Sequence, residues 1–171
     1  EDGRTERALE MTRAAVDAAR HGGPVVYCGN LSEAAATYGR LGDAAAAREA
    51  AVEGLRIGRD EGLTQMVIAI VMAAAWLAAD RDDLETAAVL LAGVARHGDP
   101  LGIGGSQLVD LCRIESQAAV DTFPGNLDAA HSLAAAMTFN DLINYTLDSL
   151  EPAAEHDPQA GDSSADSGTF H

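Results

Sequence analysis

Apolar residues recur along most of the chain at spacings of three and four, which is typical of one buried face of an α-helix. No convincing alternation at a spacing of two, which would predict a strand, is present; the one candidate strand, the apolar run at 25–27, is too short to count. Glycine, proline and capping residues divide the pattern into about eight segments. The sequence therefore predicts an all-α fold, with helices at about 4–21, 31–41, 43–60, 64–80, 82–97, 106–122, 127–137 and 138–150, the fifth of which opens near Asp82 or Asp83.

Local signals fix several of these boundaries. Gly22-Gly23-Pro24 should end the first helix, and either Asn30 or Ser32 should cap the second. Asp43 is a good N-cap for the third helix. The sequence from Thr138 to Asp141 has the spacing of a capping box, in which two side chains satisfy backbone N–H groups reciprocally.

One spacing of residues recurs along the chain and suggests helical repeats. Around the turn at Gly42-Asp43, Tyr38 precedes and Ala47 and Gly54-Leu55 follow. This order of residues resembles the tetratricopeptide pattern, in which small residues mark where one helix crosses its neighbour closely and large residues fill the gaps. The same spacing recurs at steps of about 40 residues, at Ala8 with Ala15-Val16, Ala87 with Val94-Ala95, and Ala129 with Ala136-Met137. We therefore expect antiparallel helix pairs stacked in register.

Composition indicates how such helices would pack. Apolar residues make up 47% of the 171 residues, but aromatic residues only 4%, so alanine, leucine, valine and isoleucine must build the core. Alanine-rich helices can approach each other closely. The most apolar run, 66–79, is shorter than the ~20 residues that span a bilayer, so we interpret it as a buried core helix. Trp76 and Tyr38 are expected in the core, although Trp76 could instead line a concave groove.

Charge excludes several partners. The formal net charge is −16, which disfavours binding to nucleic acid and to anionic membranes. Two cysteines, Cys28 and Cys112, do not form a disulfide framework, and we expect buried thiols in a reducing cytoplasm. From residue 152 the chain is polar and acidic, so we expect a helical-repeat domain at 1–151 and a disordered acidic tail or linker at 152–171.

Two segments give the most specific resemblance to a known family. The segment DDLETAAVLLAGVARHGDPLG (82–102) has an acidic turn, an alanine- and leucine-rich helix and a Gly/Pro-rich loop, and FPGNLDAAHSLAAAMTFNDLINYTLDSL (123–150) would be the closing unit. Together they resemble the tetratricopeptide-like region of bacterial signal-transduction ATPase regulators, such as MalT-like and LuxR-type transcriptional regulators and their cyclase-fused actinobacterial relatives. Three alanines at 134–136 replace a common glycine of that pattern, and Thr138 and Asp141 replace its serine and glutamate.

The resemblance implies a right-handed superhelix and a fragment of a longer array that carries no catalytic motif itself. Any ATPase, cyclase or DNA-binding activity would belong to other domains of the same polypeptide. We therefore expect no catalytic, cofactor-binding or metal-binding residue in this segment, and no cofactor.

Three features could carry chemistry, and each has a simpler interpretation. The loop Gly98–Ser106 lacks the lysine and the preceding strand of a phosphate-binding loop. The acidic residues at 80–85 lack calcium-loop spacing and suit helix capping. The histidines are scattered and form no i, i+4 ligand pair; they are His21, His97, His131, His156 and His171.

The repeat pattern and the absence of a catalytic motif predict a cytoplasmic, non-catalytic sensor or protein-interaction module, and the resemblance implies that it is part of a transcriptional regulator. Such a module would bind a protein segment or a small effector and control an attached ATPase or output domain. Two alternatives stay open: a helical oligomerisation domain that forms homo-oligomers, and, less favoured, a small helical enzyme whose site gathers dispersed histidine and carboxylate side chains.

Overall fold

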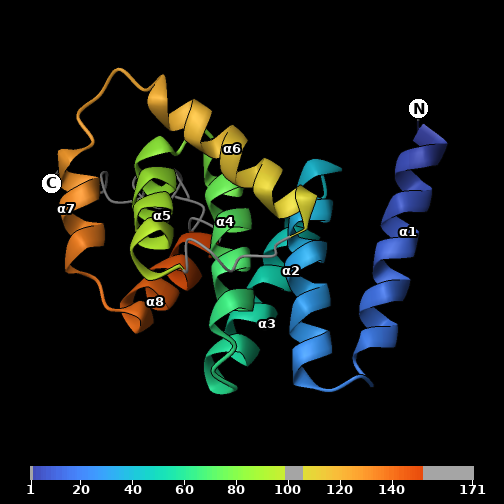
Figure 1. Ribbon diagram of the computed structural model, residues 1–171. Coiled ribbons are helices and arrows are strands. Elements are labelled where there is room, and N and C mark those ends of the chain that lie inside the picture. The colour runs from blue at the N-terminus through green and yellow to red at the C-terminus, as the bar shows by residue number, and fades with distance from the viewer. Residues whose placement is uncertain (1, 99–105, 152–171) are drawn as a thin grey trace, which may run out of the picture.

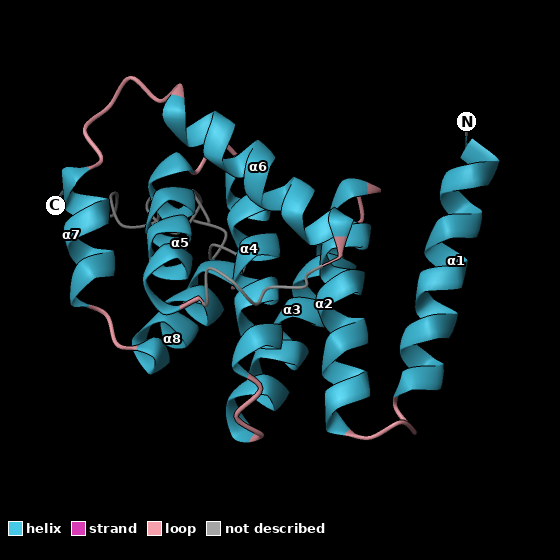
Figure 2. Cartoon of the chain, viewed as in Figure 1, coloured by secondary structure: helices cyan, strands magenta, loops and turns pink. Residues whose placement is uncertain are grey.

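A computed structural model of the chain describes residues 2–98 and 106–151. Every regular element in these ranges is an α-helix, so the predicted all-α class is confirmed (Figures 1 and 2). The predicted acidic tail at 152–171 and most of the loop at 98–106 lie outside the described residues. The helices are α1 (Asp2–Ala19), α2 (Pro24–Arg40), α3 (Ala44–Asp60), α4 (Thr64–Asp80), α5 (Leu84–His97), α6 (Gln107–Asp121), α7 (Asp128–Ala136) and α8 (Phe139–Leu150).

The start of α2 differs from the sequence-based expectation. The helix begins at Pro24, so the valines and tyrosine at 25–27 are helical and neither Asn30 nor Ser32 is a cap. Proline suits the first turn of a helix, because its fixed φ is already helical and the missing N–H would have had no partner there. The proline that was expected to follow the end of α1 therefore begins the next helix.

Three successive turns between helices share one hydrogen-bonding pattern. In each, the backbone N–H after a left-handed residue donates to a carbonyl five residues earlier, which closes the end of the preceding helix. The left-handed residues are Gly42, Gly62 and Asp82. The bonds are Asp43 N to Tyr38 O (2.9 Å), Leu63 N to Gly58 O (2.7 Å) and Asp83 N to Ala78 O (3.0 Å).

The turns before α3 and α5 match in their side chains as well. Asp43 accepts a hydrogen bond from the N–H of Ala46, and Asp83 accepts one from the N–H of Thr86. These aspartates are 40 residues apart, which is the step that the sequence pattern predicts. The hairpins α2/α3 and α4/α5 are therefore built in the same way.

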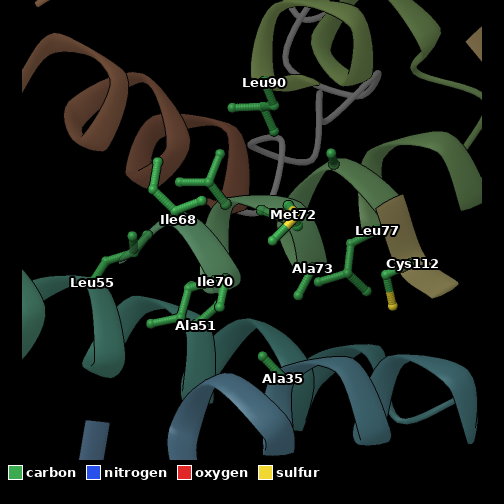
Figure 3. Close-up of a cluster of buried hydrophobic side chains, with 14 of the residues drawn as sticks. Ala35, Ala51, Leu55, Ile68, Ile70, Met72, Ala73, Leu77, Leu90 and Cys112 are labelled. Carbon is green, nitrogen blue, oxygen red and sulfur yellow. The ribbon is translucent and has the colours of Figure 1, made fainter. Parts of the chain in front are cut away.

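Helix α4 forms the centre of the packing. It contacts α2, α3, α5, α6 and α8, and it is buried almost all round. Ile68, Ile70 and Met72 of α4 are enclosed by side chains from the surrounding helices (Figure 3). The apolar run at 66–79 is thus a core helix, as predicted, and no described helix is both long and apolar enough to cross a membrane.

The last three helices do not continue the regular stacking. Helix α6 crosses α4 and reaches α2, α7 packs on α5 rather than on α6, and α8 folds back against α3, α4 and α5 (Figure 1). In a simple solenoid each repeat touches only its neighbours, so α6 would not contact α2. The contacts support paired helices in α2–α5 but do not establish the predicted superhelix, which stays a prediction.

The predicted repeat positions hold in the α2/α3 hairpin but fail in α1, where Ala15 is exposed, and toward the end of the chain. Ala47 and Leu55 are fully buried, and a Cβ on Gly54 would lie 2.6 Å from Cδ1 of Ile70, so α3 crosses α4 closely there. In contrast, Ala129 is exposed. Helix α7 packs on α5 through Ala130 and Ala134 instead, and the expectation for Ala129 was wrong.

Candidate functional site

A groove of about 730 Å³ lies between the outward face of α3 and the end of α8. Its apolar surface comes from Val52 and Ile57 of α3 and from Leu147 and Leu150 of α8. Along α3 the groove extends from residue 45 to residue 57, which is about 18 Å at the rise of an α-helix. These dimensions suit a segment lying along α3 better than a fully enclosed small molecule.

Each of the two helices buries one face in the core and leaves other residues at the groove. Helix α3 buries a stripe of small residues and Leu55 against α2 and α4, which leaves Val52 and the charged residues on its outer side. Helix α8 buries Leu142, Ile143 and Thr146, and Leu147 stays partly exposed beside α3. The capping box of Thr138 and Asp141 starts α8 as predicted.

The lining of the groove carries charged side chains of both signs. Arg48 and Arg56 line it, two helical turns apart, and neither forms an ion pair with a carboxylate among the described residues. The acidic lining residues Glu49 and Glu53 extend from α3 as well, and Glu151 follows α8. The groove therefore combines apolar contacts with charges of both signs, in a chain whose net charge is strongly negative.

One of these carboxylates already has internal partners. The hydroxyl of Tyr27 donates to Oε1 of Glu53 at 2.7 Å, and the guanidinium of Arg20 lies 5.3 Å from the centre of the Tyr27 ring. Burial, with the hydrogen bond to Glu53, raises the pKa of Tyr27 to about 12. Tyr27 is therefore protonated at neutral pH, and this cluster ties α1, α2 and α3 together beside a smaller hollow of about 310 Å³.

A second polar cluster joins α2, α4 and α6. Trp76 Nε1 donates to Oε2 of Glu115 at 2.9 Å, and the same oxygen accepts a hydrogen bond from Arg40. The hydrogen bond from Arg40 holds the pKa of Glu115 below its usual value. Trp76 is half-buried, and Tyr38 is buried as expected. The contacts of Trp76 position α6 on α2 and α4, which is a structural role.

The residues weighed for chemistry from the sequence are dispersed in the structure. Nε2 of His97 lies 3.1 Å from the carbonyl of Met137, while His21 and His131 are exposed, and His156 and His171 lie outside the described residues. Asp83 caps α5 and Ser106 caps α6. In the described ranges, histidine, cysteine, aspartate and glutamate form no group of three or more that could hold a metal ion.

The two cysteines are buried, as predicted. Both side chains are completely shielded from solvent, and burial raises the pKa of Cys28 and of Cys112 to about 11. A thiolate is the reactive form of cysteine, so both thiols are unreactive at neutral pH.

Comparisons of the chain with protein-family models, with curated proteins and with solved structures find no match. The fold and the groove define the class on their own: an all-α protein with an open, partly apolar surface groove. The sequence did not reveal the groove, because the outward residues of α3 follow the pattern of an ordinary solvated helix face. Only the return of α8 to α3 turns that face into a groove.

Proposed function

We propose that this chain is a non-catalytic protein-interaction module whose α3/α8 groove binds a protein segment. The observation that carries the proposal is the groove itself, which offers apolar contacts from two helices along three turns of α3, with charges at its rim. An amphipathic helix commonly binds in such a groove through apolar residues at i, i+3, i+4 and i+7. A small effector is less favoured, because an open groove would bury only part of its surface.

The wider role is proposed from the resemblance described above. In that role the module belongs to a cytoplasmic regulator of the MalT-like or LuxR type, and segment binding controls an attached ATPase or output domain. The 40-residue step between the equivalent caps Asp43 and Asp83 supports the repeat part of the resemblance. Catalysis and DNA binding would lie in other domains.

The test uses two synthetic amphipathic peptides with leucines at i, i+3, i+4 and i+7. One, the acidic probe, has glutamates on its polar face, and the other, the basic probe, has lysines. Each is titrated into the isotope-labelled full chain, and amide chemical shifts are followed by NMR. We expect the acidic probe to give saturable shifts of backbone amide signals, clustered at Val52, Arg56 and Leu147. Shifts that never saturate, or that cluster elsewhere, would contradict the proposal.

A helical oligomerisation domain is the second candidate, and one observation favours it. Met11 of α1 and Val25 and Val26 of α2 expose 65%, 53% and 48% of their surface. Large apolar side chains exposed on the outer helices of a protein can mark an interface between copies. Sedimentation across a concentration series distinguishes the two: self-association that Met11→Glu abolishes would support oligomerisation, whereas a monomer at all concentrations would rule it out.

A further inference from the structure

We infer that the α3/α8 groove is occupied by residues 152–171 of the same chain, so that this segment competes with any external partner. The inference rests on the proposed function, since it concerns the regulation of the same groove. Three observations carry it: where the segment begins, which charges it bears, and which cations of the groove have no partner among the described residues.

The segment is attached at the edge of the groove. Leu150 and Glu151, the last described residues, both line it. Twenty residues can extend about 65 Å, several times the ~18 Å length of the groove. Attachment at this point gives the segment an effective concentration in the millimolar range at the groove, far above that of most external partners.

The charge of the segment complements the arginines of the groove. Residues 152–171 contain four carboxylates and no lysine or arginine; the acidic residues are Glu155, Asp157, Asp162 and Asp166. Arg48 and Arg56 have no described carboxylate partner, so they offer two cations close to the attachment point. Three carboxylates line the groove as well, and one of them, Glu53, already has partners in Tyr27 and Arg20.

The segment also carries one large apolar side chain, Phe170. The partly buried Val52, Ile57 and Leu147 form the apolar surface on which an aromatic ring could lie. Apolar contact would add to the charge pairing, which is weak on its own at a solvent-exposed surface. The two contributions can be separated by substitution, as Phe170→Ser removes one and leaves the other.

The experiment places a nitroxide spin label near the end of the full chain through Ser167→Cys. Cys28 and Cys112 are buried, and the pKa of each is about 11, so the label reacts with the introduced thiol alone. Paramagnetic broadening of backbone amides then reports which surface the segment visits. We expect broadening at Val52, Arg56 and Leu147, with at least twofold loss of signal intensity, and unchanged signals in α1.

Two charge-reversal variants provide the comparison. Arg48→Glu with Arg56→Glu should abolish the broadening at the groove. Arg4→Glu with Arg7→Glu makes the same change of charge on the exposed start of α1 and should leave it unchanged. An absence of groove broadening in the parent chain, or equal effects of both variants, would overturn the inference.

A mixed sample shows whether the segment in the groove comes from the same chain or from a second copy. Isotope-labelled chain without the nitroxide is combined with spin-labelled chain without isotope. Broadening in this sample would show that the segment of a second copy occupies the groove, which also overturns the inference. Intramolecular occupancy predicts no broadening in the mixture.

A separate readout keeps the inference distinct from the proposed function. Neutralising the segment, by replacing its four carboxylates with the corresponding amides, should strengthen binding of the acidic probe about tenfold, because the competitor is weakened. Unchanged probe binding would reject competition by the segment while the proposed function survives. No probe binding to either chain would reject both.

Discussion

The helices α2–α5 and the helices α6–α8 differ in how they are connected and packed. In the first group, two hairpins repeat the same turn and the same aspartate cap 40 residues apart. In the second, α6 crosses over α4, α7 packs on α5, and α8 returns to α3. Local turn chemistry therefore determines the first region, whereas contacts distant in sequence determine the second. The groove lies where the two regions meet.

The largest expected effects test whether the two regions unfold together. Ile70 of α4 and Leu142 of α8 are both fully buried, so replacing either with alanine should cost about 2–5 kcal/mol. Leu142 packs so closely on α5 that a Cβ on Gly93 would lie 2.5 Å from its Cδ1. Urea unfolding should show one transition by both circular dichroism and Trp76 fluorescence.

Two separate transitions in Leu142→Ala would mean that α8 is a loosely attached element. In that case the groove would not be a fixed feature of the fold.

A pair of alanine substitutions tests where the repeat register ends. Ala47 and Ala129 occupy equivalent positions in the sequence pattern, but Ala47 is buried and Ala129 is exposed. Ala47→Leu should overpack the crossing of α3 and cost about 1–3 kcal/mol. Ala129→Leu should change the free energy of unfolding by less than about 0.5 kcal/mol. Equal effects in chemical denaturation would contradict the difference between the regions.

The two aspartate caps test the equivalence of the hairpins. Asp43→Ala and Asp83→Ala each remove an acceptor for a backbone N–H at a helix start and should cost about 0.5–2 kcal/mol. Asp43 also forms an exposed ion pair with Arg13, so both variants are compared in an Arg13→Ala background. Because the turns match, the two losses should then agree within about 0.5 kcal/mol. Thermal melts at one pH provide the measurement.

The smallest expected effect concerns the attachment of α6. Glu115→Gln weakens the contacts with Arg40 and Trp76 and should cost about 1 kcal/mol or less, since the pair is partly exposed. The pKa of Glu115 is lowered in the folded protein, so the ionised form stabilises the fold above the pKa of the unfolded chain. This contribution is lost as the pH falls through the lowered pKa. The stability difference between the two proteins should therefore vanish in acid, and a constant difference across pH would contradict this origin.

Most of the helices could be predicted from the sequence because their signals are local. Asp43 and the capping box at Thr138 act within four residues of their own positions, and the structure confirms both. The fifth helix was expected to open near Asp82 or Asp83, and its cap is Asp83. The buried helix at 66–79 was likewise evident from its composition. The start of α2 was missed because Pro24 can follow one helix or begin the next, and sequence spacing does not decide between them.

The candidate site could not be predicted, for a different physical reason. In the sequence, Val52 and Arg56 fit the pattern of a solvated helix face, and Leu147 fits the apolar pattern of an amphipathic helix. They form a groove only because α8 folds back on α3, a contact between positions about 90 residues apart. Nothing in the local spacing of either helix encodes that contact.

The central claim is that the α3/α8 groove binds a protein segment, and that Arg48 and Arg56 provide the contacts for acidic residues of that segment. The most direct measurement is calorimetric titration of the acidic probe at 0.15 M salt, where charges farther than about 8 Å are largely screened. We predict that Arg48→Glu with Arg56→Glu weakens binding at least tenfold, or about 1.4 kcal/mol, while Arg4→Glu with Arg7→Glu changes it less than twofold. Equal losses in the two variants, or no saturable binding to the parent chain, would contradict the claim.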